Sequence, residues 1–211
     1  MRELPIPFTG PMVLALLNGT KTQTRRNLAT GTERLICRAC GCGEKRWKHG
    51  GHSESCPGKL EWTACSLPRY GVGDRLWVKE RMFAWPRFPG EYCSSYHADG
   101  EHTLKPWPRE WTRLWSAAMH MPKMFSRLKL DVTGVKLEHL QDISEADAIA
   151  EGLIWRPALD AWSASLDPNW PTFRDPRRSY AGLWNYVNGE GSWDTNPWVA
   201  AYTFTVHKAM P

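Results

Sequence analysis

Two segments show the alternation of apolar and polar residues that a half-buried strand requires. In residues 197–207 five apolar or aromatic residues share one face: Trp198, Ala200, Tyr202, Phe204 and Val206. In residues 127–140 a similar alternation is interrupted at Gly134 and then resumes, which predicts a strand with a bulge or bend. A third, shorter strand is expected at residues 73–80, where a Gly-Asp turn precedes the apolar run.

Three segments have the outline of a helix. Residues 11–19 begin at a proline and end at a glycine. Residues 144–152 open with Ser144 and Asp147 in capping-box spacing and also end at a glycine. Residues 179–189 carry apolar side chains on one side and end at Asn-Gly.

The remaining chain falls into three long segments without a regular pattern, residues 30–68, 84–124 and 155–178. They exceed the usual connections of compact domains, so we expect binding segments or inserted modules. The order of elements predicts an α+β fold: a small mixed or antiparallel β-barrel with flanking helices and long irregular insertions. At 211 residues the chain is expected to form one domain, residues 1–211.

Composition narrows the class of protein. Hydrophobic residues make up 42% of the chain and charged residues 23%, which excludes general disorder and a membrane protein. No signal sequence or membrane-spanning run is present, so we expect a cytoplasmic location. In that reducing compartment the six cysteines are expected to be thiols or metal ligands.

The basic residues are concentrated in the first part of the chain. Residues 1–60 contain 10 Lys and Arg against 4 Asp and Glu, whereas residues 61–211 contain 17 against 18. A localised positive face suits RNA or DNA, although a basic surface alone also explains the charge. Most of the thirteen tryptophans are expected to fix loops onto the core rather than to stack on bases.

A cysteine-rich segment at about residues 35–67 is the candidate metal site. A CxxC motif followed by glycine is typical of a zinc knuckle, and two later cysteines complete a four-sulfur set: Cys37, Cys40, Cys56 and Cys65. Cys42, His49 and His52 are competing ligands. Because the segment has few apolar residues, a structural zinc would replace a core; a basic loop with reduced cysteines is the alternative.

A polar cluster, NGTKTQTRRN, follows the first predicted helix. It is a solvated turn, a phosphate clamp or part of a catalytic centre. Lys21 and Thr24 are three residues apart, so they converge only if the chain turns near Lys21. A lysine with a lowered pKa, aided by Arg25 and Arg26, is a useful base, and a threonine beside it forms a known type of dyad.

Glu151 lies in the last turn of a predicted helix, four residues after Asp147. Both the helix dipole and the like charge disfavour an anion there. Such a placement occurs more often at functional sites, although an exposed, frayed helix end also accounts for it.

The motifs NGTKTQTRR, GDRLWV, DISEADAIAEGL and the terminal YTFTV resemble the ASCH family of the PUA-like superfamily, and the fuller wording resembles ASCH proteins of bacteriophages and prophages. The resemblance implies a β-barrel whose cleft accepts RNA or a nucleobase. It also implies an amidohydrolase that removes the acetyl group from the exocyclic amine of acetylcytidine without a catalytic cofactor. In this sequence the implied triad is Lys21, Thr24 and Glu151.

In the mechanism that we expect, Lys21 takes a proton from Thr24 or a water, and Glu151 positions Lys21 or handles protons. Five residues are expected to contact the substrate: Thr22, Arg25, Arg26, Glu80 and His120. The alternatives are a non-catalytic reader of RNA or modified bases, a ribonuclease, and a protein-interaction role for the Trp-rich loops. The substrate and the oligomeric state stay open.

Overall fold

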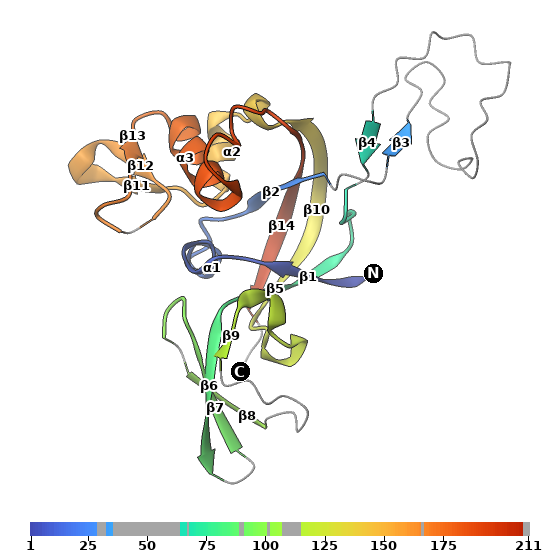
Figure 1. Cartoon of the computed structure of the whole chain (residues 1–211), viewed down its shortest axis with the longest axis vertical. Helices are drawn as coiled ribbons and strands as arrows, with labels where there is room; N and C mark the ends of the chain where they lie inside the picture. Colours follow the sequence, from blue (N-terminus) through green and yellow to red (C-terminus); the bar gives the residue numbers. More distant parts are fainter. Residues whose placement is uncertain are drawn as a thin grey trace, which may run out of the picture.

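The computed structural model describes residues 1–28, 33–35, 64–66, 68–88, 91–100, 102–106, 115–165 and 167–208 (Figure 1). Its centre is a five-stranded mixed sheet in which β1 is parallel to β5 and the other neighbours are antiparallel. The strands follow one another across the sheet in this order: β1 (Glu3–Pro7), β5 (Arg75–Lys79), β10 (Leu128–His139), β14 (Trp198–Lys208) and β2 (Gln23–Asn27).

The two strands expected from alternation, β10 and β14, form the longest pair. Their register shifts between Val132 and Gly134, so the predicted bulge is confirmed. On β14, Tyr202 and Phe204 are buried in the main core, as the alternation predicts. Val199, on the opposite face, is also fully buried, because helices cover that face near the start of the strand.

The three predicted helices are present as α1 (Gly10–Leu17), α2 (Glu145–Ala150) and α3 (Pro176–Asn188). Helix α2 is capped by Ser144, whose side chain accepts from the backbone N–H of Asp147. Helix α3 begins three residues earlier than expected, because Asp175 is its cap and accepts from the N–H of Arg177. The described residues also include four single-turn 3-10 helices: η1 (Ala118–His120), η2 (Lys123–Phe125), η3 (Leu140–Asp142) and η4 (Pro157–Leu159).

Helices α2 and α3 pack on each other and on β14 around a second apolar cluster that includes Ala148, Leu183, Trp184 and Val199. Figure 1 shows this layer at one end of the molecule, together with a small three-stranded sheet. None of the helices in the described part of the chain is long and apolar enough to cross a membrane.

The expectation that segments 84–124 and 155–178 are irregular was wrong, whereas most of segment 30–68 lies outside the described residues. Segment 155–178 contains most of a three-stranded sheet: β11 (Ile154–Arg156), β12 (Ala161–Ser163) and β13 (Thr172–Phe173). Segment 84–124 contains most of a four-stranded sheet: β6 (Met82–Phe88), β7 (Glu91–Tyr96), β8 (His102–Pro106) and β9 (Trp115–Ser116). Segment 30–68 contains a short pair: β3 (Glu33–Leu35) and β4 (Ala64–Ser66). Their proline-containing sequences lack the period-two signal on which the sequence interpretation relied.

The expected class, α+β with a mixed sheet, is confirmed, whereas a closed barrel is not found among the described residues. The edge strands β1 and β2 have no backbone pairing with each other there. A side chain joins them instead: Arg26 Nη2 of β2 donates to the carbonyl of Pro7 at the end of β1, at 2.6 Å. The two edges therefore come close at one point.

Gly152, directly after α2, should not tolerate a side chain. Its φ is 98°, and an added Cβ would lie 2.8 Å from Ala15 Cβ and 3.0 Å from Lys21 Cβ. We expect Gly152→Ala to lower the free energy of unfolding by about 2 kcal/mol or more, from backbone strain and crowding.

The matched control is Gly182→Ala in the interior of α3, where an added Cβ meets nothing within 4 Å. This change should instead stabilise the protein by about 0.5–1 kcal/mol. Denaturant unfolding measures both changes. Equal stability of the Gly152→Ala variant and the wild type would contradict the close approach of α2 to α1.

Candidate functional site

The polar cluster after α1 enters the fold through the turn that the sequence requires. Gly19 has a φ of 74°, and the backbone N–H of Lys21 donates to the carbonyl of Ala15 at 3.1 Å. Lys21 then forms an isolated antiparallel bridge with Glu151, the C-cap of α2. The two residues, 130 positions apart, are thus brought together by backbone contacts as well as by their side chains.

The Lys21 side chain is fully buried, and both of its hydrogen bonds in the described part of the chain go to Glu151. Lys21 Nζ lies 2.7 Å from Glu151 Oε2 and 2.8 Å from the Glu151 backbone carbonyl. Burial lowers the pKa of Lys21, and the nearby Glu151 carboxylate opposes this shift without cancelling it. The Lys21 amine is therefore easier to deprotonate than an ordinary lysine.

The other oxygen of Glu151 accepts from two further side chains. Arg25 Nη1 lies 3.2 Å and the Tyr180 hydroxyl 3.3 Å from Glu151 Oε1. Burial, and after it the charge of Glu151, raises the pKa of Tyr180 well above its ordinary value, so its hydroxyl stays protonated and donates. Side chains from the turn after α1, from β2 and from α3 thus fix Glu151, and each of its carboxylate oxygens has a partner.

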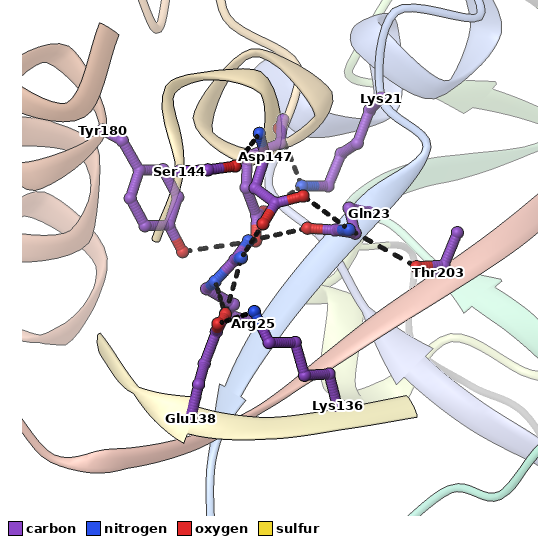
Figure 2. Close-up of polar contacts among 10 residues, drawn as sticks. Lys21, Gln23, Arg25, Lys136, Glu138, Ser144, Asp147, Tyr180 and Thr203 are labelled. Carbon is purple, nitrogen blue, oxygen red and sulfur yellow. Dashed lines mark hydrogen bonds and ion pairs between the residues drawn. The ribbon is translucent and has the colours of Figure 1, made fainter. Parts of the chain in front are cut away.

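Arg25 is also fully engaged inside the protein. Its five N–H donors all have acceptors: Nε and Nη2 reach Glu138 Oε1 at 2.9 and 2.7 Å, Nη2 reaches Asp147 at 3.2 Å, and Nη1 reaches Gln23 at 2.8 Å as well as Glu151. Figure 2 shows Arg25 between Glu138, Asp147 and Gln23. In this arrangement Arg25 has no donor left for a substrate, so it positions Glu151 instead of contacting a phosphate as expected.

The sheet makes this network possible. Arg25 on β2 and Lys136 on β10 are both paired with Ala201, on opposite sides of β14. Glu138 is two residues further along β10, on the same face as Lys136. Because Ala201 is small, the Arg25 side chain can reach across β14 to Glu138, which also forms an ion pair with Lys136 at 2.7 Å.

Thr24 is next to Arg25 on β2, so its side chain faces the opposite side of the strand, and it lines a pocket of about 380 Å³. Its side chain is nearly buried, and it makes none of the hydrogen bonds that hold Lys21, Arg25 and Glu151 together. Glu151, Arg25 and Arg26 also line the pocket, while Lys21 lies behind them. Of the expected triad, Glu151 and Thr24 therefore line the pocket, and Lys21 is joined to the pocket wall through its hydrogen bonds to Glu151.

Aromatic residues form much of the pocket wall: Tyr70, Tyr180, Trp184 and Tyr202. Tyr70 and Tyr202 meet edge to face, with ring centroids 5.2 Å apart. The sequence interpretation placed Tyr180, Trp184 and Tyr202 in regular elements but did not assign any of the four to a site. Their convergence depends on which strands and helices become neighbours, and no local pattern encodes that.

Three expected contact residues lie elsewhere. Thr22 is exposed and does not line the pocket. Glu80 is buried beyond the end of β5, where both its oxygens accept from Arg127 at 2.8 Å. His120, in η1, is exposed and also absent from the pocket wall. The expectation that Glu80 and His120 form the wall of this pocket was therefore wrong, because the elements that carry them pack on the side of the β6–β9 sheet.

The structure describes one of the four predicted zinc ligands. Cys37, Cys40 and Cys56 lie outside the described residues, and Cys65 lies in β4, opposite Arg34. Within the described ranges no group of three or more His, Cys, Asp and Glu side chains is arranged to hold a metal ion. The four-cysteine site stays a prediction.

Comparison with protein-family models, with curated proteins and with solved structures found no match for this chain. The resemblance to the ASCH family accordingly stays a prediction from the sequence motifs.

Removing the Glu151 carboxylate should destabilise the protein strongly. Lys21 and Arg25 would lose the anion that they share, and breaking a buried ion pair from one side costs about 3–5 kcal/mol. We expect Glu151→Ala to lose an amount in this range in denaturant unfolding. Glu145→Ala, at an exposed position of the same helix, should cost no more than about 1 kcal/mol. Similar losses in the two variants would show that Glu151 is not the centre of the network.

Proposed function

We propose that this protein is an amidohydrolase of the ASCH type, with a PUA-like fold, that removes an acyl group from the exocyclic amine of a modified cytidine. The observation that carries the proposal is the joining of Lys21, with its lowered pKa, to Glu151 at the wall of an aromatic pocket that also contains Thr24. A pocket of about 380 Å³ is within the usual range for small ligands. Its aromatic wall suits a nucleobase, which offers flat faces to stack.

The hydrogen bonds of Lys21 suit a general base in catalysis. A neutral amine has two N–H groups and one lone pair, and the two bonds to Glu151 use both N–H groups. The lone pair is then available to accept the proton of the Thr24 hydroxyl or of a water beside it. Glu151 therefore orients the base, while Arg25 and Tyr180 hold Glu151 in place.

In the proposed reaction, the neutral Lys21 amine takes a proton as the oxygen of Thr24, or of a water, attacks the acyl carbonyl carbon. The tetrahedral intermediate carries negative charge near Arg26, which lines the pocket. Collapse breaks the C–N bond, and the protonated Lys21 returns its proton to the departing amine. With Thr24 as nucleophile, a water then cleaves the acyl-threonine ester, and the carboxylate product leaves.

One observation favours a second function, a non-catalytic reader of modified bases. The Thr24 hydroxyl is not hydrogen-bonded to Lys21, so the dyad is not assembled without a ligand. A reader would bind the base in the same aromatic pocket and release it unchanged. Turnover distinguishes the two functions.

Single substitutions of the triad should remove activity on acetylcytidine. We expect Lys21→Met and Thr24→Val to lower kcat by about 10²-fold or more, because each removes a group that takes part in proton transfer or attack. Thr22→Val, at the exposed neighbouring position, should retain full activity. Chromatographic separation of acetylcytidine from cytidine measures the rates. Full turnover in either triad variant would refute the assignment, and no turnover in a folded wild-type protein would favour the reader.

The rate should depend on pH as Lys21 titrates. Only neutral Lys21 can act as the base, and burial lowers its pKa below the ordinary 10.5. We therefore expect kcat/KM to rise with pH and to reach a plateau below pH 10.5, once the measured rate is corrected for the uncatalysed alkaline hydrolysis of the substrate. A rate that continues to rise beyond this pH, or that falls between neutral and mildly alkaline pH, would contradict Lys21 as the base.

A further inference from the structure

The charges around the pocket are unevenly matched. Inside the network, three carboxylates have ion-pair partners in three cations: Glu138, Asp147 and Glu151 are paired with Lys21, Arg25 and Lys136. With Lys21 protonated, these six charges balance one another. Three arginines and one glutamate line the pocket, and this glutamate, Glu151, belongs to the balanced network. Among the described residues, two of the three arginines therefore have no ion-pair partner.

These two are Arg26 and Arg69. No carboxylate of the described residues lies within ion-pair distance of either one. Arg26 uses Nη2 for the Pro7 carbonyl, and its Cζ lies 5.0 Å from the centre of the Phe8 ring. Burial lowers the pKa of Arg26, and the charges of neighbouring groups, Glu151 among them, oppose this shift without cancelling it.

Arg69 lies at the exposed part of the pocket wall, beside the aromatic surface. Its Cζ is 5.6 Å from the ring centre of Tyr70. This cation–π contact leaves the charge of Arg69 without a negatively charged partner among the described residues. A further cation is close by, because burial and then the charge of Arg69 lower the pKa of Lys79. Arg69 thus places positive charge at the pocket wall, next to the aromatic surface on which a nucleobase would stack.

We propose that the pocket binds its base as part of a phosphate ester, with the phosphate held by Arg69 at the mouth and with Arg26 contributing positive charge inside. This inference rests on the proposed function for the identity of the base, and adds that the preferred ligand is anionic. A guanidinium binds a phosphate through two parallel N–H donors. Among the described residues no carboxylate forms an ion pair with Arg69, whereas the donors of Arg25 are all used.

The phosphate can belong to a mononucleotide or to an RNA strand, and the ligands of the test separate these sources. Binding is measured by calorimetry at low and at physiological salt for acetylcytidine, for acetylcytidine 5′-monophosphate and for a short single-stranded RNA with one acetylcytidine. The proteins are the wild type, Arg69→Gln, and the control Arg178→Gln, which changes an exposed arginine of α3 outside the pocket wall.

We expect at least one phosphate-bearing ligand to bind the wild type about tenfold more tightly than the nucleoside at low salt, and less so at high salt. Arg69→Gln should remove most of this preference, and Arg178→Gln should keep it. A preference already complete with the monophosphate identifies a nucleotide ligand; one that appears only with the oligonucleotide identifies an RNA strand. Equal affinity for all three ligands, binding of none, or a preference unchanged in Arg69→Gln would overturn the proposal.

Hydrolysis measured in parallel separates this inference from the proposed function. A phosphate preference without release of the acetyl group would support the inference and refute the amidohydrolase. Release of the acetyl group at equal rates and affinities for the nucleoside and its phosphates would support the amidohydrolase and refute the phosphate inference.

Discussion

One carboxylate, that of Glu151, is shared by two buried cations, and the site depends on it. Lys21 and Arg25 both lie in the protein interior, where an unpaired charge is costly. Their segments, the turn after α1 and strand β2, are held to the end of α2 by ion pairs, by the Lys21–Glu151 backbone bridge and by the bond from Thr22 N–H to the Ala150 carbonyl. The same contacts that tie these segments together therefore set the geometry at the pocket.

The network also explains several sequence features that local rules disfavour. An anion at the C-terminus of α2, four residues after Asp147, costs stability on its own. Both carboxylates accept from Arg25, so the two like charges are held by one guanidinium. Ala201 and Gly152 are small for a related reason, since one lies under the path of Arg25 across β14 and the other lies against Lys21.

The sequence predicts the elements that have a strong period or a clear cap. Strand β14, the bulge at Gly134 and the Ser144 cap follow from local patterns, and all three are present. The pairing of Lys21 with Glu151 was expected from a motif resemblance together with the unfavourable position of Glu151. Its partner Arg25 was expected at the substrate, because a sequence cannot show that Glu138, on a strand more than a hundred residues away, takes up its donors.

The short sheets and the pocket wall could not be predicted from the sequence, for a different reason. Strands such as β11, β12 and β13 have two or three residues each, too few to show a period. Tyr70, Tyr180 and Tyr202 lie on three separate segments and meet only through the order of strands and the packing of α3. Glu80 shows the converse, since its position at a strand end suggested a site, yet Arg127 pairs with both its oxygens.

The proposed chemistry and the proposed ligand make separate demands on the same pocket. Hydrolysis needs Thr24 or a water close to the acyl carbonyl, with Lys21 ready to take a proton, whereas recognition needs the aromatic wall and the unpaired charges of Arg26 and Arg69. The network of Glu151 and Arg25 serves the first demand by fixing Lys21, the proposed proton acceptor. It also serves the second indirectly, because Lys21 and Arg25 pair with Glu151, the one carboxylate of the described pocket wall.

The most direct test of this account is a crystal structure of the Lys21→Met variant with acetylcytidine bound. The account predicts that the base stacks within the aromatic wall, with the acyl carbonyl carbon about 3–3.5 Å from Thr24 Oγ1 or from a water beside it. A base bound outside this pocket, or an acyl group directed away from Thr24, would contradict it.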